Sequence, residues 1–165
     1  MADFINTIDI LGDDGLADAI VSDTLEELCD DAVTKLGYQV LANNSVLKKI
    51  HVPNVSSFYA SAYMCTSLHT VIAPAATEIN SYSFINCSSL NALVLGGATM
   101  CSLGNKNALT GTPIASGTGY VYVPSALVDS YKAATNWSTY ADQFRALEDY
   151  TVDGTTTGEL DETKI

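Results

Sequence analysis

The sequence predicts an α/β solenoid, a short right-handed coil with a parallel β-sheet that is capped by C-terminal helices. Three observations predict it. Apolar residues recur every 21–22 residues, each recurrence opens with a strand-like alternation, and helical periodicity follows Pro124. With 165 residues and 47% hydrophobic residues, the chain suffices for one domain with a continuous core.

Leucines set the period. They begin four repeats, and three residues after each leucine stands a further apolar residue. The repeats start at Leu25, Leu47, Leu68 and Leu90, and the second apolar residues are Leu28, Ile50, Val71 and Leu93. The resulting division is an N-terminal cap or attachment segment (1–24), repeats (25–124, with a closing strand at 120–124), a helical cap (125–147) and an acidic tail (148–165).

Each repeat is expected to supply one strand. In residues 47–52, alternate apolar side chains face the core, and Lys49 and His51 face outward. Pro53 ends the strand, and the rest of the repeat is the crossover to the next parallel strand, which is right-handed by default. We expect Phe58 and Phe84 to return from these crossovers to the same core.

The ends of the chain are expected to cap the repeats. Residues 126–134 have helical periodicity after the N-cap candidate Ser125, and residues 138–147 form a second helix-like stretch. Trp137, between them, is expected to seal the last repeat. At the other end, residues 4–11 alternate like a strand and residues 13–23 suit a short helix.

The cysteines and histidines give little indication of chemistry. The four cysteines form no C-x-x-C pair and no cluster with histidine, so we expect no metal site, and buried free thiols are the favoured interpretation. Cys65 and Cys87 share a repeat position, which leaves a disulfide between them open. His51 and His69 occupy different positions of neighbouring strands. We expect no catalytic residue and no cofactor, and therefore no enzyme.

The outward face of the sheet is the candidate binding face. Charged residues lie at its N-terminal end and apolar and aromatic residues at the other, which favours a binding or oligomerising surface. Strand propensity alone is the alternative explanation. The predicted face consists of Lys49, His51, Thr70, Ile72, Ala92, Val94, Tyr120 and Tyr122.

Two repeats carry a family resemblance. LKKIHVPNVSSFYASAYMCTS and LHTVIAPAATEINSYSFINCSS resemble the BspA-like (Treponema pallidum type) leucine-rich repeats, and the resemblance covers residues 25–124. The opening MADFINTIDILGDD and the segments 111–150 and 151–165 are similar to those of repeat proteins in gut Firmicutes phages and prophages. The resemblance implies a phage structural protein of the tail or adhesion apparatus. The alternatives are a BspA-type surface adhesin and an intracellular phage protein that binds a host factor.

Charge and localisation complete the expectations. The net charge is −12, with ten acidic residues and no Lys or Arg in residues 1–34, which disfavours nucleic acid as a partner. No basic, apolar leader opens the chain and no apolar run could span a bilayer, so we expect no Sec signal peptide and no membrane insertion. The expected location is the virion tail, after synthesis in the host cytoplasm. The expected partners are a bacterial surface protein or glycan, or other virion proteins. Monomer and homo-oligomer, a trimer by analogy with tail fibres, both stay open.

Overall fold

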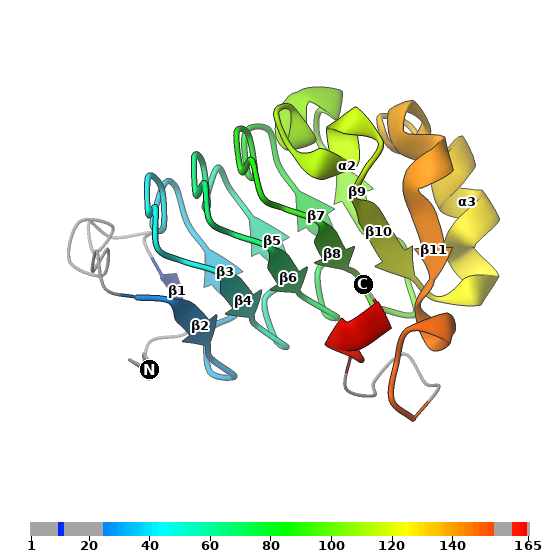
Figure 1. The fold of residues 1–165 in the computed structure, drawn as a ribbon, viewed down its shortest axis with the longest axis horizontal. Helices are drawn as coiled ribbons and strands as arrows, with labels where there is room; N and C mark the ends of the chain where they lie inside the picture. Colours follow the sequence, from blue (N-terminus) through cyan, green and yellow to red (C-terminus); the bar gives the residue numbers. More distant parts are fainter. Residues whose placement is uncertain (1–9, 12–24, 154–159, 165) are drawn as a thin grey trace.

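Two parallel β-sheets and a few short helices make up the fold, which is of the α/β class (Figure 1). The computed structural model describes residues 10–11, 25–153 and 160–164. From residue 25 to residue 103 the chain alternates between the sheets, with one strand in each sheet per repeat. The main core lies between the two sheets, where Phe58 and Phe84 pack with their ring centroids 5.3 Å apart.

The first sheet, which we call sheet A, contains the strands that the leucine period predicts. Its buried central residues pair in register from one repeat to the next, as Leu28 with Ile50, Ile50 with Val71 and Val71 with Leu93. Val121 of the closing strand pairs with Leu93. The strands are, in spatial order, β2 (Glu27–Cys29), β4 (Lys49–His51), β6 (Thr70–Ile72), β8 (Ala92–Val94), β10 (Tyr120–Val123) and β11 (Phe144–Ala146).

The second sheet, sheet B, was not predicted, since the sequence was interpreted as one sheet with irregular crossovers. Each crossover contains a two-residue strand whose second residue is buried. In the fourth repeat Leu103 pairs with Ile79. The period implied Cys101 at this position, and Cys101, two residues earlier, is buried as well. Gly97 lies against the preceding repeat, where a Cβ atom would come within 2.8 Å of the Pro74 carbonyl oxygen. The strands are β1 (Ile10–Leu11), β3 (Lys35–Leu36), β5 (Ser57–Phe58), β7 (Glu78–Ile79) and β9 (Ser102–Leu103).

Turns that lead from sheet B back to sheet A lie along one edge of the molecule, at the top of Figure 1. We call residues 37–47, 59–68 and 80–90 the turn segments. Backbone hydrogen bonds join each to the next, including Leu41 N–H to Ser61 O (2.9 Å) and Ala62 N–H to Ser83 O (3.0 Å). Each segment also holds two non-glycine residues with positive φ, which an L-residue adopts only at a cost in energy. The non-glycine residues with positive φ in these segments are Gln39, Asn43, Ala60, Met64, Tyr82 and Asn86.

The C-terminal cap differs from the two predicted helices. The first is present as α3 (Val128–Ala133) after a short 3-10 turn at Ser125–Leu127, and α2 (Pro113–Ser116) precedes β10. The second is a 3-10 stretch at Trp137–Gln143, and its last residues form strand β11, parallel to β10. The helix prediction for 144–146 was therefore wrong, because these residues extend sheet A and bury Phe144 against Tyr131 and Trp137.

Two side-chain expectations for the cap had different outcomes. Trp137 is 1% exposed and donates its indole N–H to the Cys101 carbonyl oxygen (2.8 Å), which attaches the cap to the last repeat as expected. Ser125 does not cap a helix through its side chain. Its backbone N–H and its hydroxyl contact the carboxylate of Glu148 instead.

At the N-terminal end, only β1 falls on the expected strand, and it pairs with β3 of the first repeat. The other residues of that strand (4–9) and the expected helix (13–23) lie outside the described residues.

Candidate functional site

The predicted binding face is the side of sheet A that points away from the main core. Its residues form two rows, because the strands pair in register. Lys49, Thr70, Ala92 and Tyr120 make one row, and His51, Ile72, Val94 and Tyr122 make the other. The sequence pattern predicted that all eight side chains lie on one face of sheet A, and the strand register agrees with this prediction.

Half of this face is covered, which the sequence analysis did not anticipate. Ala92, Val94 and Tyr122 are 1%, 4% and 1% exposed and form a second apolar cluster with Leu147 and Leu160. The expectation that these three residues form an open surface was wrong. The C-terminal segment, orange to red in Figure 1, lies over the sheet beside β8 and β10 and removes them from solvent.

We call residues 147–153 and 160–164 the tail segment. Tyr150 packs its ring edge-on against Tyr122, with centroids 4.7 Å apart, and Thr151 forms an antiparallel bridge with Leu160. Burial of Tyr122 raises the pKa of its phenol to about 12. Just before the tail segment, the Arg145 guanidinium lies 4.1 Å from the ring centre of Tyr120. These contacts make the outer face of the C-terminal strands a small core of its own.

The open part of the face lies over β2, β4 and β6. His51 is exposed, Lys49 and Ile72 are half-buried, and Thr70 is 9% exposed. Partial burial and the neighbouring charge of Lys49 lower the pKa of His51 below its ordinary value of 6.5. The open part is therefore small and mixed in character, because Glu27 of β2 lies in register beside Lys49, and Ile72 adds an apolar component.

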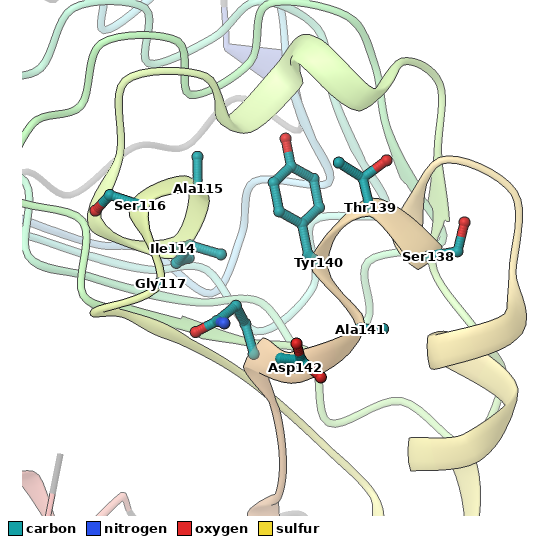
Figure 2. Close-up of a pocket in the computed structure, with 10 residues that line it drawn as sticks. Ile114, Ala115, Ser116, Gly117, Ser138, Thr139, Tyr140, Ala141 and Asp142 are labelled. Carbon is teal, nitrogen blue, oxygen red and sulfur yellow. The ribbon is translucent and has the colours of Figure 1, made fainter.

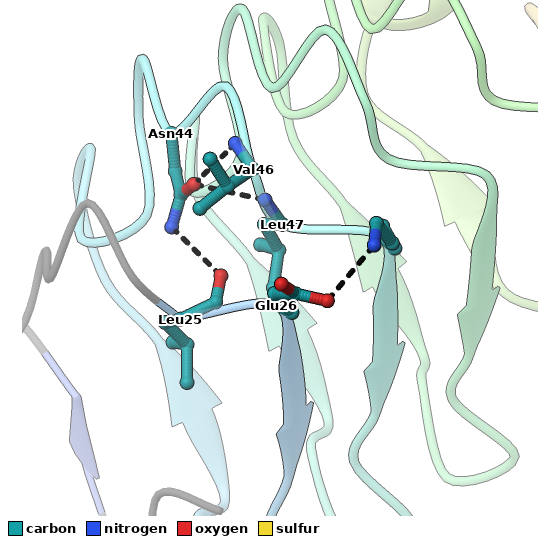
Figure 3. A network of polar contacts seen from close by, with 6 residues as sticks. Leu25, Glu26, Asn44, Val46 and Leu47 are labelled. Carbon is teal, nitrogen blue, oxygen red and sulfur yellow. Dashed lines mark hydrogen bonds and ion pairs between the residues drawn. The ribbon is translucent and has the colours of Figure 1, made fainter. Parts of the chain in front are cut away.

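A polar network lies at the N-terminal edge of this open part (Figure 3). Lys48 forms an ion pair of 2.8 Å with Glu26 of the previous repeat, and the hydrogen bond between them lowers the pKa of Glu26 and raises that of Lys48. Nearby, buried Asn44 donates to Leu25 O and accepts from the backbone N–H groups of Val46 and Leu47. Asn44 thus ties the end of the first repeat to the start of that same repeat and to Leu47, which begins the next one.

Cys65 and Cys87 occupy the repeat position that Asn44 occupies one repeat earlier. Both are buried free thiols, and their Sγ atoms contact the carbonyl oxygens of Leu41 (2.9 Å) and Ala62 (3.0 Å). The possible disulfide between them is not formed. Burial raises the pKa of the Cys65 thiol to about 12 and raises that of Cys87 as well. In the part of the chain that the structure describes, no group of three or more His, Cys, Asp and Glu residues could hold a metal ion.

A polar hollow beside the C-terminal cap was not predicted from the sequence (Figure 2). It measures about 240 Å³ and lies between the end of α2 and the 3-10 stretch, with Tyr140, Asp142 and Gln143 on its wall. The Tyr140 hydroxyl donates to the Lys106 carbonyl oxygen. Gln143 Oε1 is buried without a hydrogen-bond partner among the described residues.

Three exposed tyrosines on the turn segments were also missed. Tyr38, Tyr59 and Tyr82 are 55%, 55% and 57% exposed, and the rings of Tyr38 and Tyr59 lie 5.8 Å apart. The sequence carries a signal for Tyr38 and Tyr59, which are 21 residues apart and directly precede the positive-φ residues Gln39 and Ala60 of their turns. Tyr82 itself occupies that positive-φ position, so no shared spacing marks it.

Comparison with protein-family models, with curated proteins and with solved structures found no match to this chain. Within the described residues, no helix is long and apolar enough to cross a membrane.

Proposed function

We propose that the chain is a non-enzymatic binding protein, built as a short right-handed leucine-rich-repeat solenoid, that serves as a phage tail or adhesion component. One observation carries the proposal. The buried residues of five successive sheet A strands pair in register, at the spacing of the leucine period through the four repeats. Such stacking of short repeats generates an extended surface, and recognition is the use to which repeat proteins put it.

The cap supports the solenoid part of the proposal, because a stack of repeats needs its last core layer closed. Tyr131, Trp137 and Phe144 form an aromatic cluster over the end of the stack. Tyr131 accepts from Cys101 N–H (2.7 Å), and Asn136 donates to Leu103 O (2.7 Å), so that the cap is attached to the last repeat by both backbone and side chain.

The proposed binding role has support in the exposed side chains. The described residues outside the covered half of sheet A present His51, Lys49 and Ile72 on one face and the three tyrosines on the turn segments. Exposed aromatic side chains are enriched at recognition sites. The particular role, in a virion tail that recognises a bacterial surface molecule, rests on the family resemblance of the repeats and of the cap.

Mass spectrometry of purified virions tests the role. We expect the chain in intact particles and in the tail fraction after the particles are dissociated. Its absence from particles would overturn the virion role. A pull-down from infected cells in which one cytosolic host protein dominates would favour the intracellular alternative.

A further inference from the structure

We propose that the exposed tyrosines of the turn segments form a binding site for a neutral glycan chain. The inference deepens the proposed function, on which it rests, because it names the class of surface molecule and moves its site away from sheet A. It concerns Tyr38, Tyr59 and Tyr82, which lie on three successive repeats along one edge of the molecule.

Packing in the core does not explain the presence of these three rings. Each is more than half exposed, whereas the aromatic residues Phe58 and Phe84 of the same repeats are fully buried. Tyr82 has a φ of 66°, a conformation that a bulky side chain adopts only with strain. Asn86 in the same turn also has a positive φ. Asparagine tolerates this conformation better than tyrosine does, so the backbone conformation alone does not call for a tyrosine.

The turn segments hold the tyrosine rings in place before any ligand binds. The turn segments are joined by backbone hydrogen bonds, among them Asn43 N–H to Tyr63 O (2.7 Å) and Met64 N–H to Ile85 O (2.9 Å). Two buried serines reinforce this ladder, since Ser61 donates to Leu36 O (2.7 Å) and Ser83 donates to Phe58 O (3.2 Å). The rings therefore project from a fixed framework, and a ligand that spans several repeats would lose little affinity to ordering of the protein.

The surface around the tyrosines is polar and uncharged. The chain has a net charge of −12, yet the three turn segments contain no charged residue. Their exposed polar side chains are amides and hydroxyls, such as Gln39, Asn43 and Asn86. A neutral sugar matches both components. Its C–H faces pack on the electron-rich faces of aromatic rings, and its hydroxyls pair with amides and hydroxyls.

A hollow of about 490 Å³ lies where the last turn segment meets the next repeat. The polar side chains that line it are the hydroxyls of Ser88, Thr112, Ser116 and Thr118, and none of its lining residues is charged. The uncharged, hydroxyl-rich character of the edge thus continues beyond the tyrosines toward the C-terminal cap.

The placement of the tyrosines and the charged residues beside them favour a glycan over a protein. A stable protein interface covers about 800 Å² on each partner around a desolvated centre. The tyrosines instead lie one repeat apart along the stack, and charged residues begin on the adjoining strands of sheet B, at Lys35 and Glu78. A linear chain of sugar rings suits such a strip, whereas a protein epitope would also have to accommodate the flanking charges.

The test is binding of the purified full chain to an array of neutral and acidic oligosaccharides, followed by titration of the best neutral ligand. We expect neutral glycans to bind. Each of Tyr38→Ala, Tyr59→Ala and Tyr82→Asn should weaken that binding by roughly 2- to 13-fold, the value of one aromatic contact. Tyr82→Asn suits its positive φ, so it removes the ring without loss of stability. Val152→Ala, at a side chain of the tail segment that is 67% exposed, is the control and should leave affinity unchanged.

Four results would overturn the inference. The first is that only acidic glycans bind, and the second is that no glycan binds. The third is that the three tyrosine variants leave binding of neutral glycans intact. The fourth is that the tyrosines are needed for binding of a protein partner and not of a glycan. Thermal unfolding of every variant separates loss of binding from loss of fold. If the chain is present in virion tails but no glycan binds, the glycan inference fails and the virion role stands.

Discussion

Tyr122 provides the sharpest test of the covered face. Tyr122 belongs to the face that the sequence predicts to be open, and on an open face Tyr122→Ala would cost little stability. In the structure the side chain is 1% exposed and packs against the tail segment. Loss of its buried apolar surface should cost about 2–3 kcal/mol, and loss of the edge-on contact with Tyr150 a further 0.5–1.5 kcal/mol. We therefore expect the variant to lose roughly 2.5–4.5 kcal/mol of unfolding free energy.

The stability lost in Tyr122→Ala is limited by how strongly the tail segment is held on sheet A. If the tail segment leaves the sheet before the repeats unfold, the loss cannot exceed the free energy that holds it there. The two cases are distinguishable, because Trp137 is the only tryptophan and sits in the cap of the main core. Its fluorescence in urea reports unfolding of the repeats, and hydrogen exchange at the amides of Tyr150 and Asp161 reports release of the tail segment.

The control is Val152→Ala, a truncation in the same segment at a side chain that is 67% exposed. It should change stability by less than about 0.5 kcal/mol, as surface substitutions do. Tyr122→Ala with a loss below about 1 kcal/mol and with unchanged exchange at Tyr150 would refute the reasoning, since Tyr122 would then not be covered.

Three further predictions follow from the core, the thiols and the imidazole. Phe84→Ala should lower the unfolding free energy in urea by about 3–5 kcal/mol, because the ring is fully buried, and a loss under about 1 kcal/mol would contradict its place in the core. A thiol reagent near pH 8 should label one cysteine per native chain, and Cys29→Ser should abolish that labelling, because the other three thiols are buried with raised pKa. The lowered pKa of His51 means that the unfolded chain binds its proton more tightly, so this group should cost stability as pH falls below about 6.5. His51→Gln should flatten that part of a stability–pH curve, and an unaltered slope would contradict the assigned shift.

Sheet A was predictable because its signal is periodic and local. One leucine and one further apolar residue recur in each repeat, and parallel pairing of equivalent residues follows from the equal spacing. Sheet B was not predicted, because its strands are only two residues long and an alternation of two residues carries no pattern. Strand β11 was mistaken for helix for a related reason. Tyr140, Phe144 and Leu147 fit a helical spacing, yet pairing with β10 decides the conformation of the last turn.

The covered half of the face shows a different limit. Side-chain direction along a strand is a local property, so the eight candidate residues could be assigned to one face from sequence. Which part of a face stays open depends on residues far along the chain, here Leu147, Tyr150 and Leu160. The apolar residues Val94 and Tyr122 were a correct signal of contact, but the contact is made within the chain and not with a partner.

This distinction bears on where the chain can bind a partner. The tail segment covers the apolar part of the sheet A face. An external partner would therefore have to displace Tyr150 and Leu160 to reach it. The tyrosines of the turn segments have no such cover, and Tyr82 is held at positive φ while more than half exposed. Of the two aromatic surfaces, the turns are therefore accessible without a conformational change. A partner that recognises the folded chain as it stands should find its aromatic contacts there.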